Sequence, residues 1–238
     1  MTEVSELGKA EIGARIRNLR TRVAAAALAA GRDPESIGIL AVSKLQPAAA
    51  IRAGMAAGLA DFGENFLQEA LAKMDEIGAG PARWHFIGAL QSNKTSAVAE
   101  RFDWVHSLDR EKIATRLSRQ RPPGMAPLNV CIQVRIGQEA SKSGVEPAEA
   151  ESLARRVAGM PGLRLRGLMA VPPPETDPAR QRAWCRQLKE LFDALQAAGL
   201  EMDTLSMGMS DDLEAAVAEG STLVRIGTAI FGPRPGQA

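Results

Sequence analysis

Lys44 is the first side chain in this sequence whose type and position suggest covalent chemistry. It follows the apolar run Ile39–Val42 and Ser43, and Pro47 then opens a helical stretch. Such a run predicts a buried parallel strand, and α/β proteins keep their sites where such strands end. A lysine amine there can form a Schiff base with a carbonyl compound. From this stretch alone, a solvated lysine that closes a strand is the favoured interpretation, because lysines are mostly exposed.

The stretch Ser206–Ser210 has the composition of an anion-binding loop. It reads Ser-Met-Gly-Met-Ser and is followed by Asp211 and Asp212, where we expect a helix to begin. Small residues, two hydroxyls and a helix N-terminus favour negative charge, because free backbone N–H groups and the helix dipole both point towards it. The ordinary alternative is a loop in which Ser210 caps the helix.

A second stretch, Val224–Gly232, strengthens the case for an anion. Gly227 permits close approach of the backbone to a ligand, and Thr228 adds a hydroxyl beside a further N–H. Each stretch is weak evidence alone. Together, at the ends of what we predict to be the last two strands, they indicate a bound phosphate.

An amine that faces a bound phosphate suggests a Schiff base to a phosphorylated aldehyde. Two chemistries fit this arrangement of Lys44 and the two late loops: a lysine aldolase that acts on a sugar phosphate, or a pyridoxal phosphate site. A Ser43–Lys44 nucleophile pair is disfavoured, because adjacent strand residues point to opposite faces.

The elements that must position these groups alternate regularly along the chain. Ile12, Ile16, Leu19 and Val23 form one face of an opening helix, which Gly31 is expected to stop. The predicted strands are 39–43, 59–63, 84–88, 104–107, 128–136, 163–170, 204–207 and 223–227. The clearest helical patterns between them are 64–77, 180–198 and 211–219.

Eight strand–helix units in this length predict a closed (β/α)8 TIM barrel with an extra N-terminal helix. A doubly wound open sheet is the alternative. The absence of a Gly-rich dinucleotide fingerprint after the first strand makes it less favoured. We see no domain boundary, so residues 1–238 are expected to form a single domain.

The composition is that of a soluble globular protein, with 45% hydrophobic and 24% charged residues. A net charge of +1 gives no case for nucleic acid or an acidic membrane surface as a partner. Cys131 and Cys185 suggest structural thiols in a reducing compartment rather than a disulfide framework. With no signal peptide and no membrane-length apolar run, we expect a cytoplasmic protein.

Several short motifs, in one order along nearly the whole chain, resemble a single family. They are Val42-Ser43-Lys44, Phe62 to Asn65 with Gln68-Glu69, Trp84 to Gly88 with Leu90-Gln91 and Asn93-Lys94, Glu139 with Ser141-Lys142 and Gly144, Gly167 to Met169, Leu205 to Ser210, and Val224 to Gly232. The sequence resembles the pyridoxal phosphate homeostasis proteins. That family shares the barrel of the alanine racemases and lacks their second, β-rich domain. The chain departs from the family pattern at Arg135, where Asn is expected.

The resemblance implies a cofactor, pyridoxal 5′-phosphate, and residues that bind it. Lys44 would be the Schiff-base lysine. Ser206, Gly227 and Thr228 would hold the phosphate, with help from Ser210. The resemblance further implies that Arg225 faces the pyridine nitrogen and that two residues line the cofactor, Asn65 and Met207.

Arg225 has a chemical consequence. A guanidinium is always charged and can only donate, so a ring nitrogen opposite it must accept and stay unprotonated. An unprotonated pyridine is a weak electron sink. Alanine racemases combine such a ring with two bases, a lysine and a tyrosine. Since this chain has no tyrosine, that mechanism is excluded as it stands.

His85 and His106 are the remaining candidates for a second base. A structural histidine is the favoured interpretation of His85, which lies within a predicted strand. Two histidines alone also make a poor metal site. Lys142, in the loop 135–144, is a candidate for receiving the aldehyde or binding a second anion, although a solvated loop lysine is the ordinary interpretation.

The expected function is to bind pyridoxal phosphate on Lys44 and to buffer or deliver it to apo-enzymes, without strong catalysis. The chain is expected to be a monomer, because the domain and the tyrosine from which racemases complete a shared site are missing. Two alternatives remain: an amino-acid racemase that uses the same cofactor, and a lysine aldolase.

Overall fold

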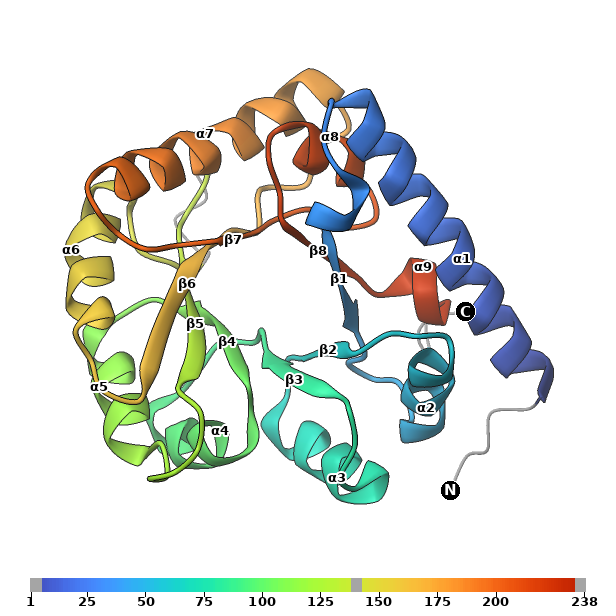
Figure 1. Ribbon diagram of the computed structural model, residues 1–238, viewed down its shortest axis with the longest axis horizontal. Coiled ribbons are helices and arrows are strands. Elements are labelled where there is room, and N and C mark those ends of the chain that lie inside the picture. Colours follow the sequence, from blue (N-terminus) through green and yellow to red (C-terminus); the bar gives the residue numbers. More distant parts are fainter. Residues whose placement is uncertain (1–5, 138–142, 234–238) are drawn as a thin grey trace.

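The sheet closes on itself because the last strand pairs with the first. In the computed structural model, which describes residues 6–137 and 143–233, β1 and β8 are parallel, with Gly38 opposite Leu223 and Ala41 opposite Ile226. Every neighbouring pair follows chain order, which makes a closed parallel barrel (Figure 1). The strands are β1 (Gly38–Val42), β2 (Asp61–Glu64), β3 (Arg83–Phe86), β4 (Trp104–Leu108), β5 (Leu128–Gln133), β6 (Leu163–Met169), β7 (Thr204–Ser206) and β8 (Leu223–Ile226).

A helix follows each strand and covers the outside of the barrel (Figure 1). The helices are α1 (Glu6–Ala29), α2 (Ala48–Ala56), α3 (Leu67–Ile77), α4 (Thr95–Arg101), α5 (Glu111–Gln120), α6 (Pro147–Ala158), α7 (Pro178–Ala197), α8 (Leu213–Ala218) and α9 (Thr228–Phe231), with 3-10 turns at Pro34–Ser36 and Ser92–Lys94. The predicted (β/α)8 barrel with one extra N-terminal helix is therefore confirmed. All strands in the described part of the chain belong to the barrel.

Helix α1 packs against α8, α9 and α2 (Figure 1). Its face of Ile12, Ile16, Leu19 and Val23 is buried, as the spacing predicted. Burying side chains of this size contributes roughly 1.5–3 kcal/mol each. Gly31, with φ 66°, ends the helix as expected. Helix α1 thus lies outside the part of the barrel where β8 meets β1 (Figure 1).

Two predicted helices begin later than their sequence patterns suggested. The pattern 64–77 becomes α3 only at Leu67, because Glu64 pairs with Phe86 as the last residue of β2. The pattern 211–219 becomes α8 at Leu213, and Asp212 is its N-cap. The carboxylate of Asp212 accepts the Met209 N–H at 2.6 Å. The alternative of Ser210 as the helix cap is therefore wrong.

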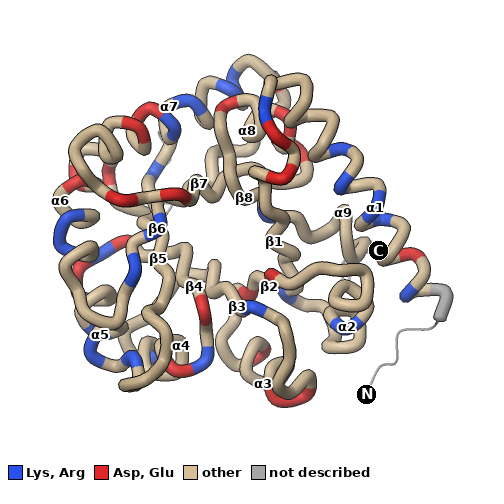
Figure 2. Tube along the Cα trace, in the orientation of Figure 1, with Lys and Arg blue, Asp and Glu red and all other residues tan. Residues whose placement is uncertain are grey.

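Charges of both signs are interspersed over the outer helices (Figure 2). Several pairs join neighbouring elements: Arg22 of α1 contacts Glu214 of α8 at 2.6 Å, and Arg186 of α7 contacts Glu219, the C-cap of α8, at 3.0 Å. Exposed pairs such as Arg22–Glu214 contribute about 0–1 kcal/mol each. The stability of the fold therefore rests mainly on the apolar layer between barrel and helices.

The two cysteines are free and buried, as expected of structural thiols. Burial raises the pKa of both Cys131 and Cys185 to about 12, which keeps them protonated and unreactive. Among the helices within residues 6–137 and 143–233, none is long and apolar enough to cross a membrane.

Candidate functional site

A cavity of about 720 Å³ opens where the strands end at their C-terminal side. Cavities of this size are typical of small-molecule and cofactor sites. The structure brings most of the predicted site residues to its wall: Lys44, Asn65, Ser210, Arg225, Gly227 and Thr228. They come from the ends of β1, β2, β7 and β8, and the first two strands meet the last two because β1 pairs with β8 as the barrel closes. Their roles towards a cofactor stay predictions.

Ser206 and Met207 are not among the residues that line this cavity. Both are fully buried, and the Ser206 hydroxyl lies 2.9 Å from Nη1 of Arg225 and 3.0 Å from Nδ1 of His106. Ser206 is the last residue of β7 and its side chain points into the barrel, beneath the cavity. A phosphate contact from Ser206 stays a prediction, and Ser210 is the serine of this loop that lines the cavity.

Arg225 is an immobilised cation at the base of the cavity. Its Nη1 donates to the Ser206 carbonyl at 2.6 Å and to the Ser206 hydroxyl at 2.9 Å, and its Nη2 donates to the Ala170 carbonyl at 2.7 Å. Burial lowers the pKa of Arg225 to about 10, so the guanidinium stays charged at neutral pH. The group can only donate, which fits a ligand that presents an acceptor.

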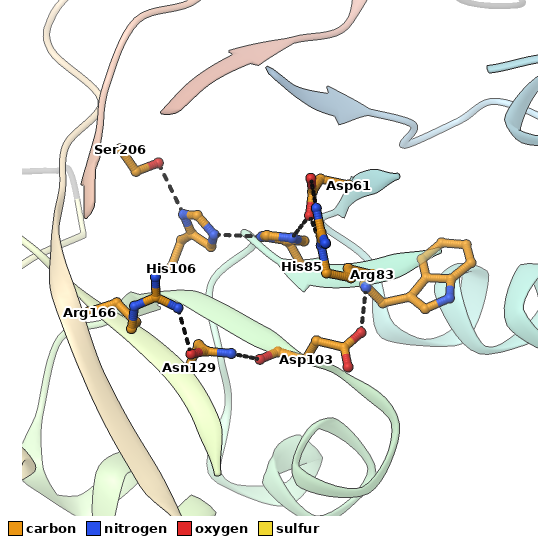
Figure 3. Close-up of polar contacts among 9 residues, drawn as sticks. Asp61, Arg83, His85, Asp103, His106, Asn129, Arg166 and Ser206 are labelled. Atoms are coloured by element: carbon orange, nitrogen blue, oxygen red, sulfur yellow. Dashed lines mark hydrogen bonds and ion pairs between the residues drawn. The ribbon is translucent and has the colours of Figure 1, made fainter. Parts of the chain in front are cut away.

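Arg225 donates to the Ser206 hydroxyl. From Ser206 a row of hydrogen bonds continues through the barrel interior (Figure 3). Below Ser206, Nε2 of His106 lies 2.9 Å from Nδ1 of His85, and Nε2 of His85 lies 2.9 Å from Oδ1 of Asp61. Arg83 completes the chain with two contacts to Asp61, at 2.6 and 2.7 Å. The chain links the two ends of the barrel.

The two ends of this chain determine where its protons lie. Arg225 can only donate and the Asp61 carboxylate can only accept, so Ser206 must donate to Nδ1 of His106, and each imidazole must carry its proton on Nε2. Burial lowers the pKa of His85 and, further, that of His106, which keeps both rings neutral. Although burial opposes it, hydrogen bonds from Arg83 and His85 hold the pKa of Asp61 well below its usual range.

His85 and His106 are therefore structural histidines rather than bases at the cavity. Neither lines the cavity, and both ring nitrogens of each are engaged within the chain. The favoured interpretation of His85 is confirmed. In the part of the chain that the structure describes, no three His, Cys, Asp or Glu side chains are grouped so that they could hold a metal ion.

The opposite end of the barrel carries a second polar network (Figure 3). Arg166 donates to Asn129 at 2.9 Å and to Asp203 at 2.7 and 2.8 Å, and its guanidinium lies 4.5 Å from the centre of the Trp104 ring. Asn129 in turn donates to the Asp103 carbonyl at 3.1 Å. In barrels of this type the N-terminal face serves stability, and these satisfied ion pairs fit that role.

Asn65 is held over the cavity by close packing. A Cβ added at Gly88 would overlap the backbone carbonyl of Asn65, so only glycine lets the two loops meet. The Asn65 Oδ1 atom is buried and has no hydrogen-bond partner. A buried amide atom without a partner on a cavity wall is the kind of group that a bound ligand satisfies.

The serine beside Lys44 does not form a nucleophile pair with it. The Ser43 hydroxyl donates to the buried Oε1 of Glu64 at 2.6 Å, so it is engaged away from the cavity that Lys44 lines. Lys142 lies outside the described residues. Arg135 donates to Glu146 at 2.5 Å and to the Gly144 carbonyl at 3.2 Å, and neither contact is with the cavity wall.

Residues 13–235 match the family model of the alanine racemase N-terminal domain. The chain is 58% identical to the pyridoxal phosphate homeostasis protein of Pseudomonas aeruginosa over 223 aligned residues. The aligned region covers 94% of this chain and 96% of that protein. It is 52% identical to the protein of the same name from Escherichia coli K12, over 94% of this chain and 97% of that one. The chain belongs to the pyridoxal phosphate homeostasis protein family.

A similar protein of known structure carries the cofactor. PipY from Synechococcus elongatus PCC7942 has been determined with pyridoxal phosphate bound. PipY superposes on this protein with a TM-score of 0.81 and is 37% identical to it in sequence. The superposition covers 93% of this chain and 100% of PipY. This likeness extends over the whole of PipY.

Proposed function

We propose that this protein binds pyridoxal 5′-phosphate as a Schiff base on Lys44 and takes part in intracellular pyridoxal phosphate homeostasis, by buffering or delivering the cofactor. The observation that carries the proposal is the meeting of Lys44, the buried cation Arg225 and the hydroxyls of Ser210 and Thr228 on one cavity wall. The amine can react with the aldehyde of this cofactor, and the guanidinium can donate a hydrogen bond to its ring nitrogen. The loops that carry the two hydroxyls can bind its phosphate.

The residues present fit the cofactor. Arg225 would donate to the ring nitrogen, and Ser210 and Thr228 would donate to the phosphate. Gly227 lines the cavity and packs closely on β1, since a Cβ there would lie 3.3 Å from the Val42 carbonyl oxygen. Asn65 offers a buried amide whose Oδ1 has no partner. When bound, the cofactor supplies an aldehyde that a lysine amine can capture reversibly.

The cavity supports storage better than strong catalysis. An unprotonated ring opposite Arg225 is a weak electron sink, and no tyrosine is available as a second base. The ionisable side chains on the described wall are Lys44, Arg225 and Asp211. We therefore rank amino-acid racemisation below cofactor binding, and a lysine aldolase below both.

We also propose that residues 1–238 form one domain, and that the protein acts in the cytoplasm as a monomer that passes cofactor to apo-enzymes. The buried free thiols and the near-neutral charge of +1 support this setting. Light scattering on the purified protein tests the oligomeric state. A dimer at micromolar concentration would overturn that part of the proposal.

The absorption spectrum of the purified protein tests the central proposal. We expect a visible Schiff-base band after pyridoxal phosphate is added, and its loss in Lys44→Ala. The matched control is Lys112→Ala on α5, which removes an exposed lysine and should retain the band. Borohydride reduction followed by peptide mass spectrometry should locate the cofactor on Lys44. A wild-type protein that stays colourless with excess cofactor would refute the proposal.

Two further measurements separate the alternatives. Incubation with L- or D-alanine and L- or D-serine, followed by chiral analysis, should show little interconversion. Rapid racemisation would favour the enzyme. For an aldolase, borohydride would label Lys44 only when a sugar phosphate is present, whereas we expect labelling with pyridoxal phosphate alone.

A further inference from the structure

Both neighbours of Lys44 are anchored by side chains of β2 and α3. The Ser43 hydroxyl donates to Oε1 of Glu64 at 2.6 Å, and the Ser43 carbonyl accepts from Nζ of Lys73 at 2.7 Å. On the other side, the Leu45 N–H donates to Oε1 of Glu69 at 2.5 Å. The backbone that carries Lys44 is thus held at both ends by groups outside the cavity.

The anchored segment has a backbone conformation that its sequence does not favour. Leu45 has φ 62°, and within residues 6–137 and 143–233 no other non-glycine residue has a positive φ. The Gln46 N–H donates to the Ser43 carbonyl at 3.0 Å, which makes a four-residue turn with Leu45 in third place. Turns with a positive φ there ordinarily carry Gly or Asn, because a Cβ is strained in the left-handed region.

Burial of the leucine side chain does not explain the strained turn, since Leu45 is 48% exposed. The hydrogen bond from its N–H to Glu69 is a contact that holds the turn directly. Strained backbone persists only where surrounding contacts determine it, and it is concentrated at functional sites. Here it lies next to the lysine of the candidate cavity.

Lys73 joins the anchors to one another. Its Nζ lies 2.8 Å from Oε1 of Glu64 and 2.5 Å from Oε1 of Glu69, besides its bond to Ser43. Lys73 and Glu64 are buried, and burial raises the pKa of Glu64 while the charge of Lys73 opposes that shift. A buried ionic cluster is a poor way to gain stability, because desolvation offsets the attraction. The cluster instead fixes the positions of particular backbone groups, because its hydrogen bonds are directional and apolar contacts are not.

We propose that Glu69 and Lys73 are positioning residues that hold the Ser43–Gln46 turn, and with it the amine of Lys44, in the geometry that captures the aldehyde. This inference rests on the proposed function. In the capture step the neutral amine nitrogen adds to the aldehyde carbon and a C=N bond forms. The aldehyde oxygen leaves as water with the two amine hydrogens. A prearranged amine increases the equilibrium constant of that step without altering ring or phosphate contacts.

Two ligands distinguish capture from binding: pyridoxal phosphate, and 4′-deoxypyridoxine 5′-phosphate, which has the same ring and phosphate but no aldehyde. For Glu69→Ala we expect roughly a five- to thirtyfold loss of affinity for pyridoxal phosphate, the factor that corresponds to the cost of left-handed backbone. Affinity for the deoxy compound should stay within about twofold of wild type. Glu69→Gln keeps an acceptor for the Leu45 N–H and should recover part of the loss.

The matched control is Glu76→Ala. Glu76 lies on the same helix and pairs at the surface with Arg52 at 3.0 Å, so its removal should change neither affinity. Thermal unfolding of each variant shows whether the fold is retained. Since the Glu69 side chain is 24% exposed and Lys73 keeps its contact with Glu64, we expect Glu69→Ala to remain folded.

Leu45→Gly gives a second route to the same conclusion, because glycine adopts the left-handed conformation without strain. In this background Glu69→Ala should lower the affinity for pyridoxal phosphate by less than about threefold. The inference is overturned if Glu69→Ala leaves pyridoxal phosphate affinity unchanged, or if both ligands lose affinity equally. A wild-type protein that binds the deoxy compound but never captures the aldehyde would refute the proposed function instead.

Discussion

The hydroxyl of Ser206 lies 2.9 Å from Nη1 of Arg225, beneath the cavity rather than on its wall. This contact gives Ser206 a part in aiming the guanidinium, whereas Ser210 is the serine of the same loop that lines the cavity. The two serines, four residues apart, are therefore expected to act on different parts of the ligand. We expect Ser206 to act through Arg225 on the ring, and Ser210 to act on the phosphate.

Substitution of each serine separates the two roles. Ser210→Ala should lower the affinity for pyridoxal phosphate about tenfold, because it removes a charge-assisted hydrogen bond, and should leave the affinity for pyridoxal unchanged. Ser206→Ala should weaken both ligands by the same factor. It should also destabilise the fold by about 1–3 kcal/mol, since Nδ1 of His106 loses its partner. Isothermal titration with both ligands and urea unfolding measure these effects.

Ser96→Ala on the exposed surface of α4 is the control for that experiment, because the Ser96 hydroxyl donates to Glu100 on the same helix, away from the cavity. A Ser206→Ala protein that loses affinity for pyridoxal phosphate but not for pyridoxal would restore Ser206 as a direct phosphate ligand.

The buried histidines predict how stability depends on pH. Burial lowers the folded-state pKa of His85 and His106 from the ordinary value of 6.5, so the unfolded chain binds more protons as the pH falls below about 6.5. Their contribution is complete above that pH and is lost below it, with a slope of up to about 1.4 kcal/mol per pH unit for each ring. Urea unfolding at several pH values from 5.5 to 7.5 measures this slope.

Glu64 has the opposite effect on the pH dependence of stability, because burial raises its pKa in the folded protein. Comparison of wild type with His106→Gln removes this background. The variant should be less stable at pH 7.5, and its slope below about pH 6.5 should be shallower by one proton. Equal slopes in the two proteins would show that His106 does not stay neutral in the fold.

Substitution of Asp61 tests whether a change at one end of the barrel alters binding at the other end. Asp61→Asn removes the charge that accepts from His85 and from Arg83, and should destabilise the fold by about 2–3 kcal/mol. Arg225 keeps its contacts to the carbonyls of Ser206 and Ala170, so affinity for pyridoxal phosphate at neutral pH should change less than about threefold. Urea unfolding and cofactor titration measure the two effects. A tenfold loss of affinity would show that the row of hydrogen bonds from Asp61 to Arg225 carries the change to the cavity.

Lys44 could be predicted as a candidate from the sequence because it follows a strand with a strong local pattern, whereas Arg225 was predicted through the resemblance to the family. Their meeting follows from barrel closure, which the alternation of strands and helices also predicts. The position of Ser206 could not be read in this way, since the side that a strand residue faces is decided by partners such as His106, 100 residues distant. Glu69 and Lys73 were missed as anchors for the same reason: their contacts with Ser43 and Leu45 join separate elements.

Gly88 tests whether Asn65 must stay where the packing holds it. In Gly88→Ala the new Cβ would overlap the Asn65 carbonyl, and the obstacle is backbone rather than a flexible side-chain end. We expect Asn65 to shift, with a loss of stability of about 1–3 kcal/mol from overpacking and several-fold weaker binding of pyridoxal phosphate. The control is Gly80→Ala, where the nearest atom to the new Cβ is the end of the Met55 side chain at 3.6 Å. Its stability and its affinity for pyridoxal phosphate should equal those of the wild type. Full affinity in Gly88→Ala would remove Asn65 from the proposed site.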